Sequence, residues 1–177
     1  MSIAAKKVLV PLTVLLAAGA LAVGSGATFS SESNNTISTV TSGTLLQSNS
    51  KNGAQIFGLS GIKPGDTVNG TVTITNTGSL PAVFSLTEVA SSNGFSGANL
   101  KLKIENTTTN TTVFNDTFGA LVDGAKTDLG TVAPAAANTY VFTVTLDQNA
   151  TDTEQGKTAS ATYKWSSVQE AGTVTNQ

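Results

Sequence analysis

The chain has 177 residues, a net charge of −2 and no Cys or His, and all nine of its basic residues are Lys. Without Cys or His there is no disulfide framework, thiol nucleophile, Ser-His-Asp triad or HExxH zinc site. The missing Arg and the negative charge also disfavour nucleic-acid binding. Composition therefore favours a β-rich protein that is not an enzyme.

The first 27 residues have the layout of a secretory signal peptide. Lys6 and Lys7 precede an apolar run at 8–23, and small residues follow. This run is shorter than the roughly 20 apolar residues of a spanning helix, so an uncleaved membrane anchor is the less favoured alternative. We expect a signal peptidase to cut between Ala27 and Thr28. The mature protein would then be secreted to the cell surface or extracellular matrix, with membrane contact only before cleavage.

Beyond residue 28, apolar and polar residues alternate with the period of β-strands. The apolar positions expected to face inward are Val72, Ile74, Leu102, Ile104, Phe142, Val144, Tyr163 and Trp165. Further strands are expected at 80–89 and 113–118, with weaker candidates at 54–59 and 38–46. The Lys63-Pro64-Gly65-Asp66 sequence predicts a turn that leads into a strand at 67–76.

Short strands at this spacing predict an all-β fold, a single β-sandwich or jelly-roll-like domain. The expected organisation is a signal peptide at 1–27, an extended segment at 28–43, a sandwich at 44–169 and a flexible tail at 170–177.

Candidate chemistry is sparse. Sequons for N-glycosylation begin at Asn34, Asn69, Asn106, Asn110, Asn115 and Asn149. A chain this rich in Asn and Thr also forms sequons by chance. The oxygens of Asp147, Asn149, Asp152 and Glu154 could attract Ca²⁺, but the EF-hand spacing is missing, and a solvated turn is the favoured interpretation. We therefore expect no catalytic residue, metal or cofactor.

Two motifs and the final strand suggest a family. The block GLSGIKPGDTVNGTVTITNTGSLPAVFSL spans 58–86, and Ser42-Gly43-Thr44-Leu45 precedes it. The end of the chain carries Trp165 and Gln169. Together with the signal layout, these features resemble TasA and camelysin-type secreted proteins. The likeness covers both ends and 58–86, while 90–150 does not align.

The resemblance implies a jelly-roll-like subunit, processed by a dedicated signal peptidase, that polymerises head-to-tail into biofilm-matrix fibres. Related archaeal bundling pili share this architecture. In such fibres the segment freed by cleavage completes the sheet of the next subunit. Here that donor strand would be 28–40, anchored by Phe29, Ile37 and Val40. Ile37 and Val40 fall on opposite faces of an extended strand, so the sequence leaves the register open.

Alternative functions remain at this point. Camelysins are described as metallopeptidases, an activity that a chain without His does not support. A monomeric cell-surface adhesin or binding sandwich is the main alternative. For the fibre subunit, the expected partners are other copies of the chain, the signal peptidase and other matrix components.

Overall fold

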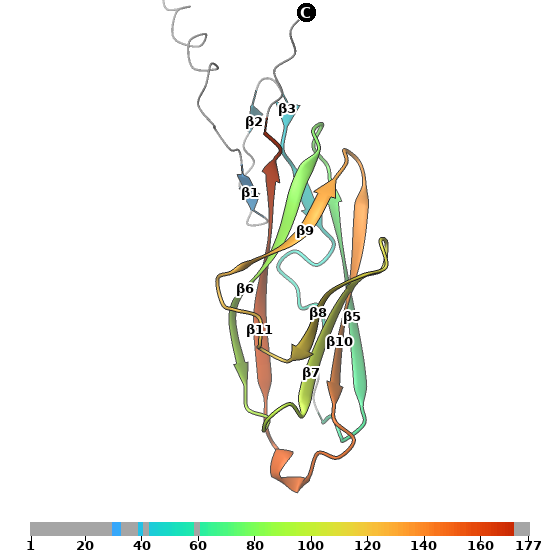
Figure 1. Cartoon of the computed structure of the whole chain (residues 1–177), viewed down its shortest axis with the longest axis vertical. Coiled ribbons are helices and arrows are strands. Elements are labelled where there is room, and N and C mark those ends of the chain that lie inside the picture. Colours follow the sequence, from blue (N-terminus) through green and yellow to red (C-terminus); the bar gives the residue numbers. More distant parts are fainter. Residues whose placement is uncertain (1–29, 33–38, 41–42, 59–60, 172–177) are drawn as a thin grey trace, which may run out of the picture.

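The computed structural model describes residues 30–32, 39–40, 43–58 and 61–171. Within these ranges two antiparallel sheets pack together as an all-β sandwich, which confirms the predicted fold class (Figure 1). The first sheet has the strand order β1 (Ser30–Glu32), β11 (Ala159–Gln169), β6 (Ala82–Asn93) and β9 (Lys126–Val132). The second has the order β4 (Gln47–Asn49), β5 (Thr67–Asn76), β10 (Ala137–Leu146), β7 (Leu100–Asn106) and β8 (Thr111–Thr117).

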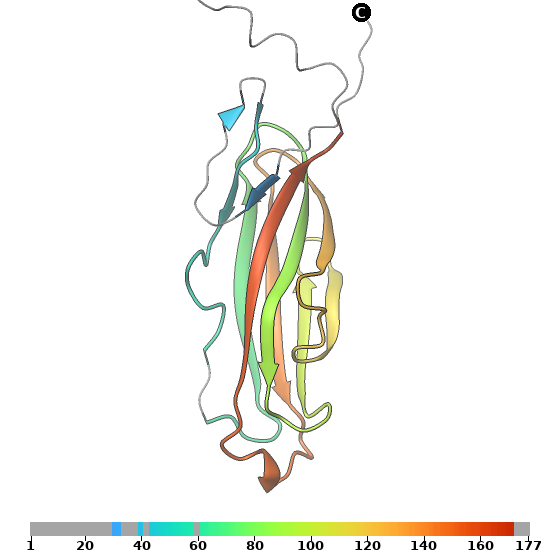
Figure 2. The same cartoon turned by 90° about the vertical axis from the view of Figure 1, so that its left-hand side faces the viewer.

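The strands run along the long axis of the molecule, so its two ends differ. A small pair formed by β2 (Thr39–Val40) and β3 (Gly43–Thr44) lies at one end, beside β1 and the C-terminal end of β11. The 3-10 turn η1 (Asp152–Glu154) lies at the opposite end (Figure 2). No helix in the described ranges is long and apolar enough to cross a membrane.

The core follows from the period-two alternation of the long strands. Side chains from both sheets meet between the layers, because alternate positions of each strand point to the same face. Tyr140, Phe142 and Trp165 form its aromatic centre, with ring centroids 4.9 Å apart for Tyr140–Trp165 and 6.4 Å for Phe142–Trp165. All eight predicted inward positions contribute to the core, Tyr163 as a partly buried member.

The predicted turn at 63–66 is confirmed. The Asp66 amide donates to the Lys63 carbonyl at 2.9 Å, and Gly65 has φ +88°, which favours glycine. The Gly65 amide donates to the Leu146 carbonyl at 2.9 Å, so the turn also fixes the end of β10.

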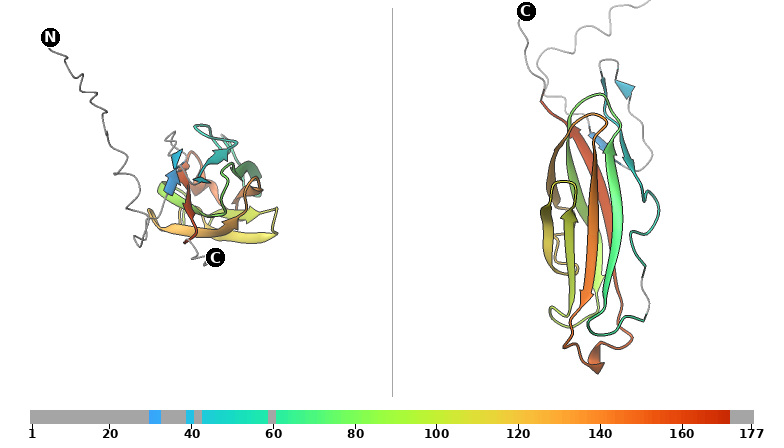
Figure 3. Two further views of the ribbon diagram at one scale, coloured as in Figure 1. Left: turned by 90° about the horizontal axis from the view of Figure 1, so that it is seen from above. Right: turned by 90° about the vertical axis from the view of Figure 1, so that its right-hand side faces the viewer.

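Of the two weaker strand predictions, the one at 54–59 was wrong and the one at 38–46 holds in part. Residues 54–58 form no strand, and in 38–46 the described strand pairing is limited to the β2–β3 pair. Strands β4 and β9 were missed. β9 lies beside β6 at the edge of the first sheet (Figure 3). Its pairing register shifts between Phe84 and Ser85 of β6. β9 is an edge strand that is exposed along much of its length, and Gly130 within it has φ +83°. Its sequence therefore shows little of the apolar–polar alternation by which a strand is predicted.

The two short motifs that suggested the family meet in space. The Ser79 amide donates to the Thr44 carbonyl at 3.0 Å, and Ser79 Oγ accepts from the Thr44 amide at 3.1 Å. Gly78 lies so close that an added Cβ would collide with the Thr44 carbonyl. This junction fixes the point at which the N-terminal segment enters the domain. The point lies at the end of the sandwich that carries β1, β2 and β3, which we call the β1–β3 end.

Candidate functional site

Strand β11 is paired on both edges over only part of its length. Its β6 edge is paired from Ala159 to Gln169, whereas on the opposite edge the described pairing is that of β1 with Ser166 to Val168. No described strand pairs with that edge between Ala159 and Tyr163. Exposed backbone donors and acceptors on a strand edge are a template for another strand.

A groove of about 920 Å³ runs beside this edge. We call it the β11 groove; one wall is residues 159–165 and the other is the segment 49–58, apart from Ser50. Val89 and Phe118 complete the lining. The groove thus joins an available strand edge to an apolar interior, the combination that β-strand addition requires.

The segment 49–58 is held against β5, which keeps the groove from closing. The Ser50 amide donates to the Thr73 carbonyl at 3.0 Å, and Ser50 Oγ accepts from the Thr73 amide at 2.8 Å. Farther along, an added Cβ on Gly70 would meet the Ile56 carbonyl at 2.5 Å. Glycine at position 70 therefore allows the close approach of this wall.

Large apolar side chains line the β11 groove. Val89 is 49% exposed although it lies on a central strand of its sheet. Ile56 and Phe57 are partly buried on the facing wall. The Phe142 ring packs on Tyr163 with centroids 5.1 Å apart, which fixes the Tyr163 ring beside the groove. An exposed valine amid partly buried aromatics suits an inserted aliphatic side chain.

Buried polar atoms without hydrogen bonds gather along β11. They include both carboxylate oxygens of Glu88, the hydroxyl oxygens of Tyr163, Ser166 and Ser167, and Oε1 of Gln47. Gln47 itself donates from Nε2 to the Trp165 carbonyl at 3.0 Å. Orphan atoms of this kind each cost about 1–3 kcal/mol, so their concentration beside one strand is informative.

Glu88 and Tyr163 form the deepest part of this cluster. Glu88 is 1% exposed, and it lies directly opposite Tyr163 in the β6–β11 pairing. Burial, and then the charge of the Glu88 carboxylate, raise the pKa of Tyr163. The pair is therefore a buried acid beside a neutral phenol that lies within reach of the carboxylate.

The predicted cleavage and anchor residues fall mostly outside this description. Ala27, Thr28, Phe29 and Ile37 lie outside the described residues. Val40 belongs to β2, where its backbone pairs with Gly43. The β11 groove itself was not predicted, because it depends on which strands become neighbours.

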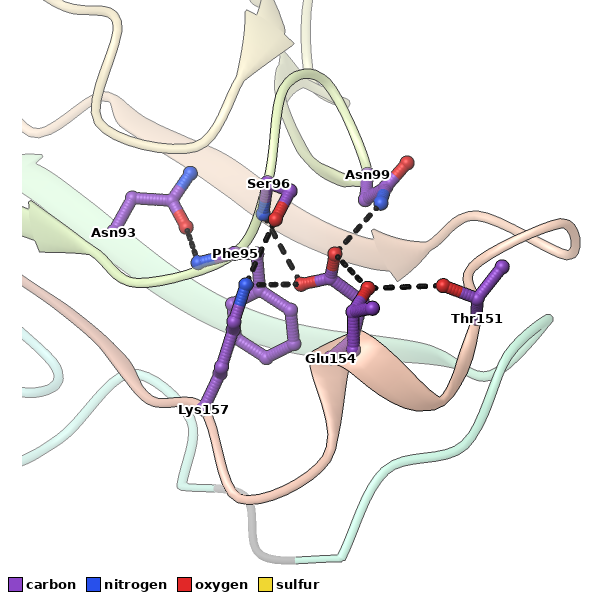
Figure 4. Close-up of polar contacts among 8 residues, drawn as sticks. Asn93, Phe95, Ser96, Asn99, Thr151, Glu154 and Lys157 are labelled. Carbon is purple, nitrogen blue, oxygen red and sulfur yellow. Dashed lines mark hydrogen bonds and ion pairs between the residues drawn. The ribbon is translucent and has the colours of Figure 1, made fainter.

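The acidic loop near η1 differs from the solvated turn expected for it. Glu154 is buried and faces the loop 96–99: it accepts from the Ser96 amide at 3.1 Å and from Asn99 Nδ2 at 3.0 Å (Figure 4). Lys157 Nζ lies 3.3 Å from Glu154 Oε2, the oxygen that also accepts from the Ser96 amide. Burial alone would raise the pKa of Glu154, but these contacts outweigh it and lower that pKa to about 2. Glu154 thus joins two loops at the η1 end.

Removal of the Glu154 charge should make the stability of the fold less dependent on pH in the acid range. A carboxyl with a folded-state pKa of about 2, against 4.5 ordinarily, stabilises the fold above pH 4.5 and loses this contribution as the pH falls toward 2. We expect Glu154→Gln to lower the urea midpoint at pH 7, and the difference from wild type to shrink toward pH 2. Asp152→Asn, at an exposed acid of the same turn, is the control. A constant difference across this range would contradict the assignment.

The described asparagines of the predicted N-glycosylation sequons differ in whether they are buried or exposed. Asn106 is buried, and its side-chain oxygen accepts from the Thr108 and Thr109 amides, so this sequon is closed in the folded protein. The sequon asparagines that the structure shows exposed are Asn69, Asn110, Asn115 and Asn149. Within the described part of the chain, no group of three acidic side chains is arranged to hold a metal ion.

Comparison with protein-family models and with curated proteins found no match.

Proposed function

We propose that the protein is a secreted structural subunit of extracellular fibres and that its subunits join by donor-strand complementation. The observation that carries this proposal is the β11 groove, where no described strand pairs with β11 between Ala159 and Tyr163 and apolar side chains lie alongside. The mature N-terminal segment 28–40 is the donor, and a neighbouring copy supplies the groove. This role is structural and requires no catalysis.

Strand addition accounts for both kinds of surface in the groove. Backbone hydrogen bonds to β11 give about 0.5–1.5 kcal/mol each, so several residues and apolar anchors are needed for a stable joint. The lining residues Val89, Phe118 and Tyr163 provide contacts for such anchors. The segment 28–40 is long enough to follow the edge, and it contains Phe29 and Ile37.

The two ends of the molecule favour open polymers. The donor would leave the domain at the end where β1 and β3 lie, whereas the stretch of β11 without a described neighbour, Ala159 to Tyr163, lies toward η1. A contact that joins different surfaces of identical subunits is heterologous, and it produces a filament when its rotation does not close. Before signal cleavage, the donor would be tethered to the membrane, so cleavage by the signal peptidase would start assembly.

Deletion of residues 28–40 tests this function. We expect mature protein 28–177 to form filaments in negative-stain microscopy and to sediment as polymers. The shortened chain 41–177 should sediment as a monomer with an unchanged β-type circular dichroism spectrum, because it loses only the short β1 and β2 pairings. Filaments from the shortened chain would refute the donor role. A mature protein that stays monomeric at high concentration would favour the adhesin alternative.

A point substitution separates donor contacts from general solubility effects. Ile37→Asp places a charge on an apolar anchor, so assembly should require a much higher protein concentration. Ser38→Asp adds the same charge at the next residue, on the opposite face of an extended strand, and should have a small effect. Equal effects of the two changes would contradict a role for Ile37 as an anchor.

A further inference from the structure

We propose that Asn52, in a turn on the wall 49–58 of the β11 groove, is a site of spontaneous deamidation in the folded protein, whereas Asn69 and Asn93, which also precede glycines, are protected. The reaction converts the Asn52 carboxamide into a carboxylate. This inference goes beyond the proposed function and does not depend on it, because it follows from the exposure and the hydrogen bonds of each asparagine and its glycine.

An Asn-Gly sequence carries its own nucleophile. The glycine amide nitrogen loses its proton and attacks Cγ of the asparagine; a C–N bond forms, the bond from Cγ to Nδ2 breaks, and ammonia leaves. Water then opens the resulting five-membered imide at either carbonyl, which gives aspartate or isoaspartate. Water is the only co-reactant. Glycine favours the attack because it has no Cβ in the way and its backbone rotates most freely.

The chain contains three such sequences, Asn52-Gly53, Asn69-Gly70 and Asn93-Gly94. Their local sequences make all three candidates. The attack also requires an amide nitrogen that is not held in a hydrogen bond, a side chain that can turn toward it, and space for the peptide to rotate. The fold decides which of the three meets these requirements.

Asn52 meets all of them. Asn52 and Gly53 are exposed in a turn that the Ala54 amide closes by donating to the Lys51 carbonyl at 2.9 Å. Gly53 has φ +69° at the third position of this turn, and an added Cβ there would meet no atom within 4 Å. In the described part of the chain, neither the Asn52 side chain nor the Gly53 amide has a hydrogen-bond partner. The peptide between them can therefore rotate while the turn stays closed.

Asn93 is held at every group that the reaction uses. Its Nδ2 donates to the Phe118 carbonyl at 2.9 Å, and its Oδ1 accepts from the Phe95 amide at 2.9 Å. The attacking nitrogen is also engaged, because the Gly94 amide donates to the Thr158 carbonyl at 3.0 Å. Deamidation at Asn93 therefore has to wait for these hydrogen bonds to open.

Asn69 is protected by its place in a long strand. Asn69 lies within β5, and its Oδ1 accepts from Thr143 Oγ1 of β10 at 2.8 Å. Gly70 is buried and lies opposite Phe142 in the β5–β10 pairing. An added Cβ on Gly70 would meet the Ile56 carbonyl at 2.5 Å, so this backbone has no room to rotate. Attack on Asn69 would require β5 to separate from β10.

The same criterion applies to aspartate before glycine, which isomerises through the same imide. Asp123-Gly124 is an exposed sequence of this kind. The Gly124 amide donates to the Glu88 carbonyl at 2.8 Å, so its nitrogen is held in place. Exposure alone therefore does not select a site, and Asn52 is distinguished by the unbonded amide that follows it.

Deamidation would change the charge of the groove wall and leave the fold in place. Asn52 lines the β11 groove, as do Lys51 and Lys164, so the new carboxylate lies on a wall that also carries basic side chains. The isoaspartate product adds one carbon to the main chain within the turn. The hydrogen bond that attaches this wall to β5, from the Ser50 amide to the Thr73 carbonyl at 3.0 Å, lies outside the turn and should persist.

Peptide mapping of aged protein tests the assignment. Folded mature protein is incubated at mildly alkaline pH and digested with pepsin, because acid stops further deamidation. The peptide with Asn52 should gain the mass difference between NH₂ and OH, about tenfold or more faster than those with Asn69 and Asn93, which react only after local opening. An isoaspartyl methyltransferase with labelled S-adenosylmethionine should label the same peptide.

Unfolding and substitution provide the controls. In urea the three Asn-Gly peptides should react at similar rates, because the contacts that protect Asn69 and Asn93 are gone. Asn52→Gln should abolish the early mass change, since the longer side chain forms an imide ring slowly, whereas Asn115→Gln at an exposed site on β8 should leave it unchanged. The assignment is overturned if Asn69 or Asn93 reacts as fast as Asn52 in folded protein. It is also overturned if Asn52 reacts in urea and stays unmodified in the folded protein.

Discussion

Phe142→Ala is expected to lower the free energy of unfolding by about 3–5 kcal/mol. Phe142 is 0% exposed, lies on β10, and contacts the rings of Tyr163 and Trp165 on the opposite sheet. The substitution removes apolar burial and leaves a cavity between the sheets, which the surrounding strands can only partly fill. Urea unfolding of the chain 41–177 measures this change without interference from assembly.

The matched control for this change is Thr71→Ala on β5. Thr71 is exposed on the outer face of the second sheet, so its truncation should change stability by less than about 0.5 kcal/mol. A loss under about 1 kcal/mol for Phe142→Ala would mean that the core relaxes around the cavity. Because Phe142 supports the Tyr163 ring, the substitution should also weaken assembly.

Much of the fold could be predicted from the sequence because long strands carry their own signal. From Leu100 to Ile104 in β7 and from Tyr140 to Leu146 in β10 every second residue is apolar, and the structure buries these residues. The edge strands could not be predicted in this way. β4 has three residues, and β9 is exposed along much of its length, so tertiary pairing rather than local pattern defines them.

The candidate site was less predictable than the fold for a related reason. The β11 groove forms between residues 49–58 and 159–165, which are far apart in sequence, and its shape depends on how far β1 extends. One local signal was available: Glu88 is an isolated acid within an apolar strand. A buried, unpartnered acid at such a position is a reason to look for a missing partner.

The second large effect is expected at Asn76, which organises the other end of β5. Asn76 is 0% exposed; its Nδ2 donates to the Leu80 carbonyl at 2.8 Å and to the Val132 carbonyl at 2.9 Å. Its Oδ1 accepts from the Gly78 amide at 3.0 Å. Asn76→Ala removes hydrogen bonds to three backbone groups, of which the Gly78 amide keeps its bond to the Leu46 carbonyl at 3.2 Å, so we expect a loss of about 3 kcal/mol in the free energy of unfolding.

Two further variants separate hydrogen bonding from volume at this position. Asn76→Asp keeps the size but loses both donors, so it should cost at least as much as Asn76→Ala. Asn115→Ala on the exposed face of β8 should be nearly neutral. A loss below about 1 kcal/mol for Asn76→Ala would mean that water replaces the amide. Gly78 and Ser79 contact Thr44, where the N-terminal segment joins the sandwich. Loss of the Asn76 side chain should therefore also weaken the attachment of this segment to its own domain.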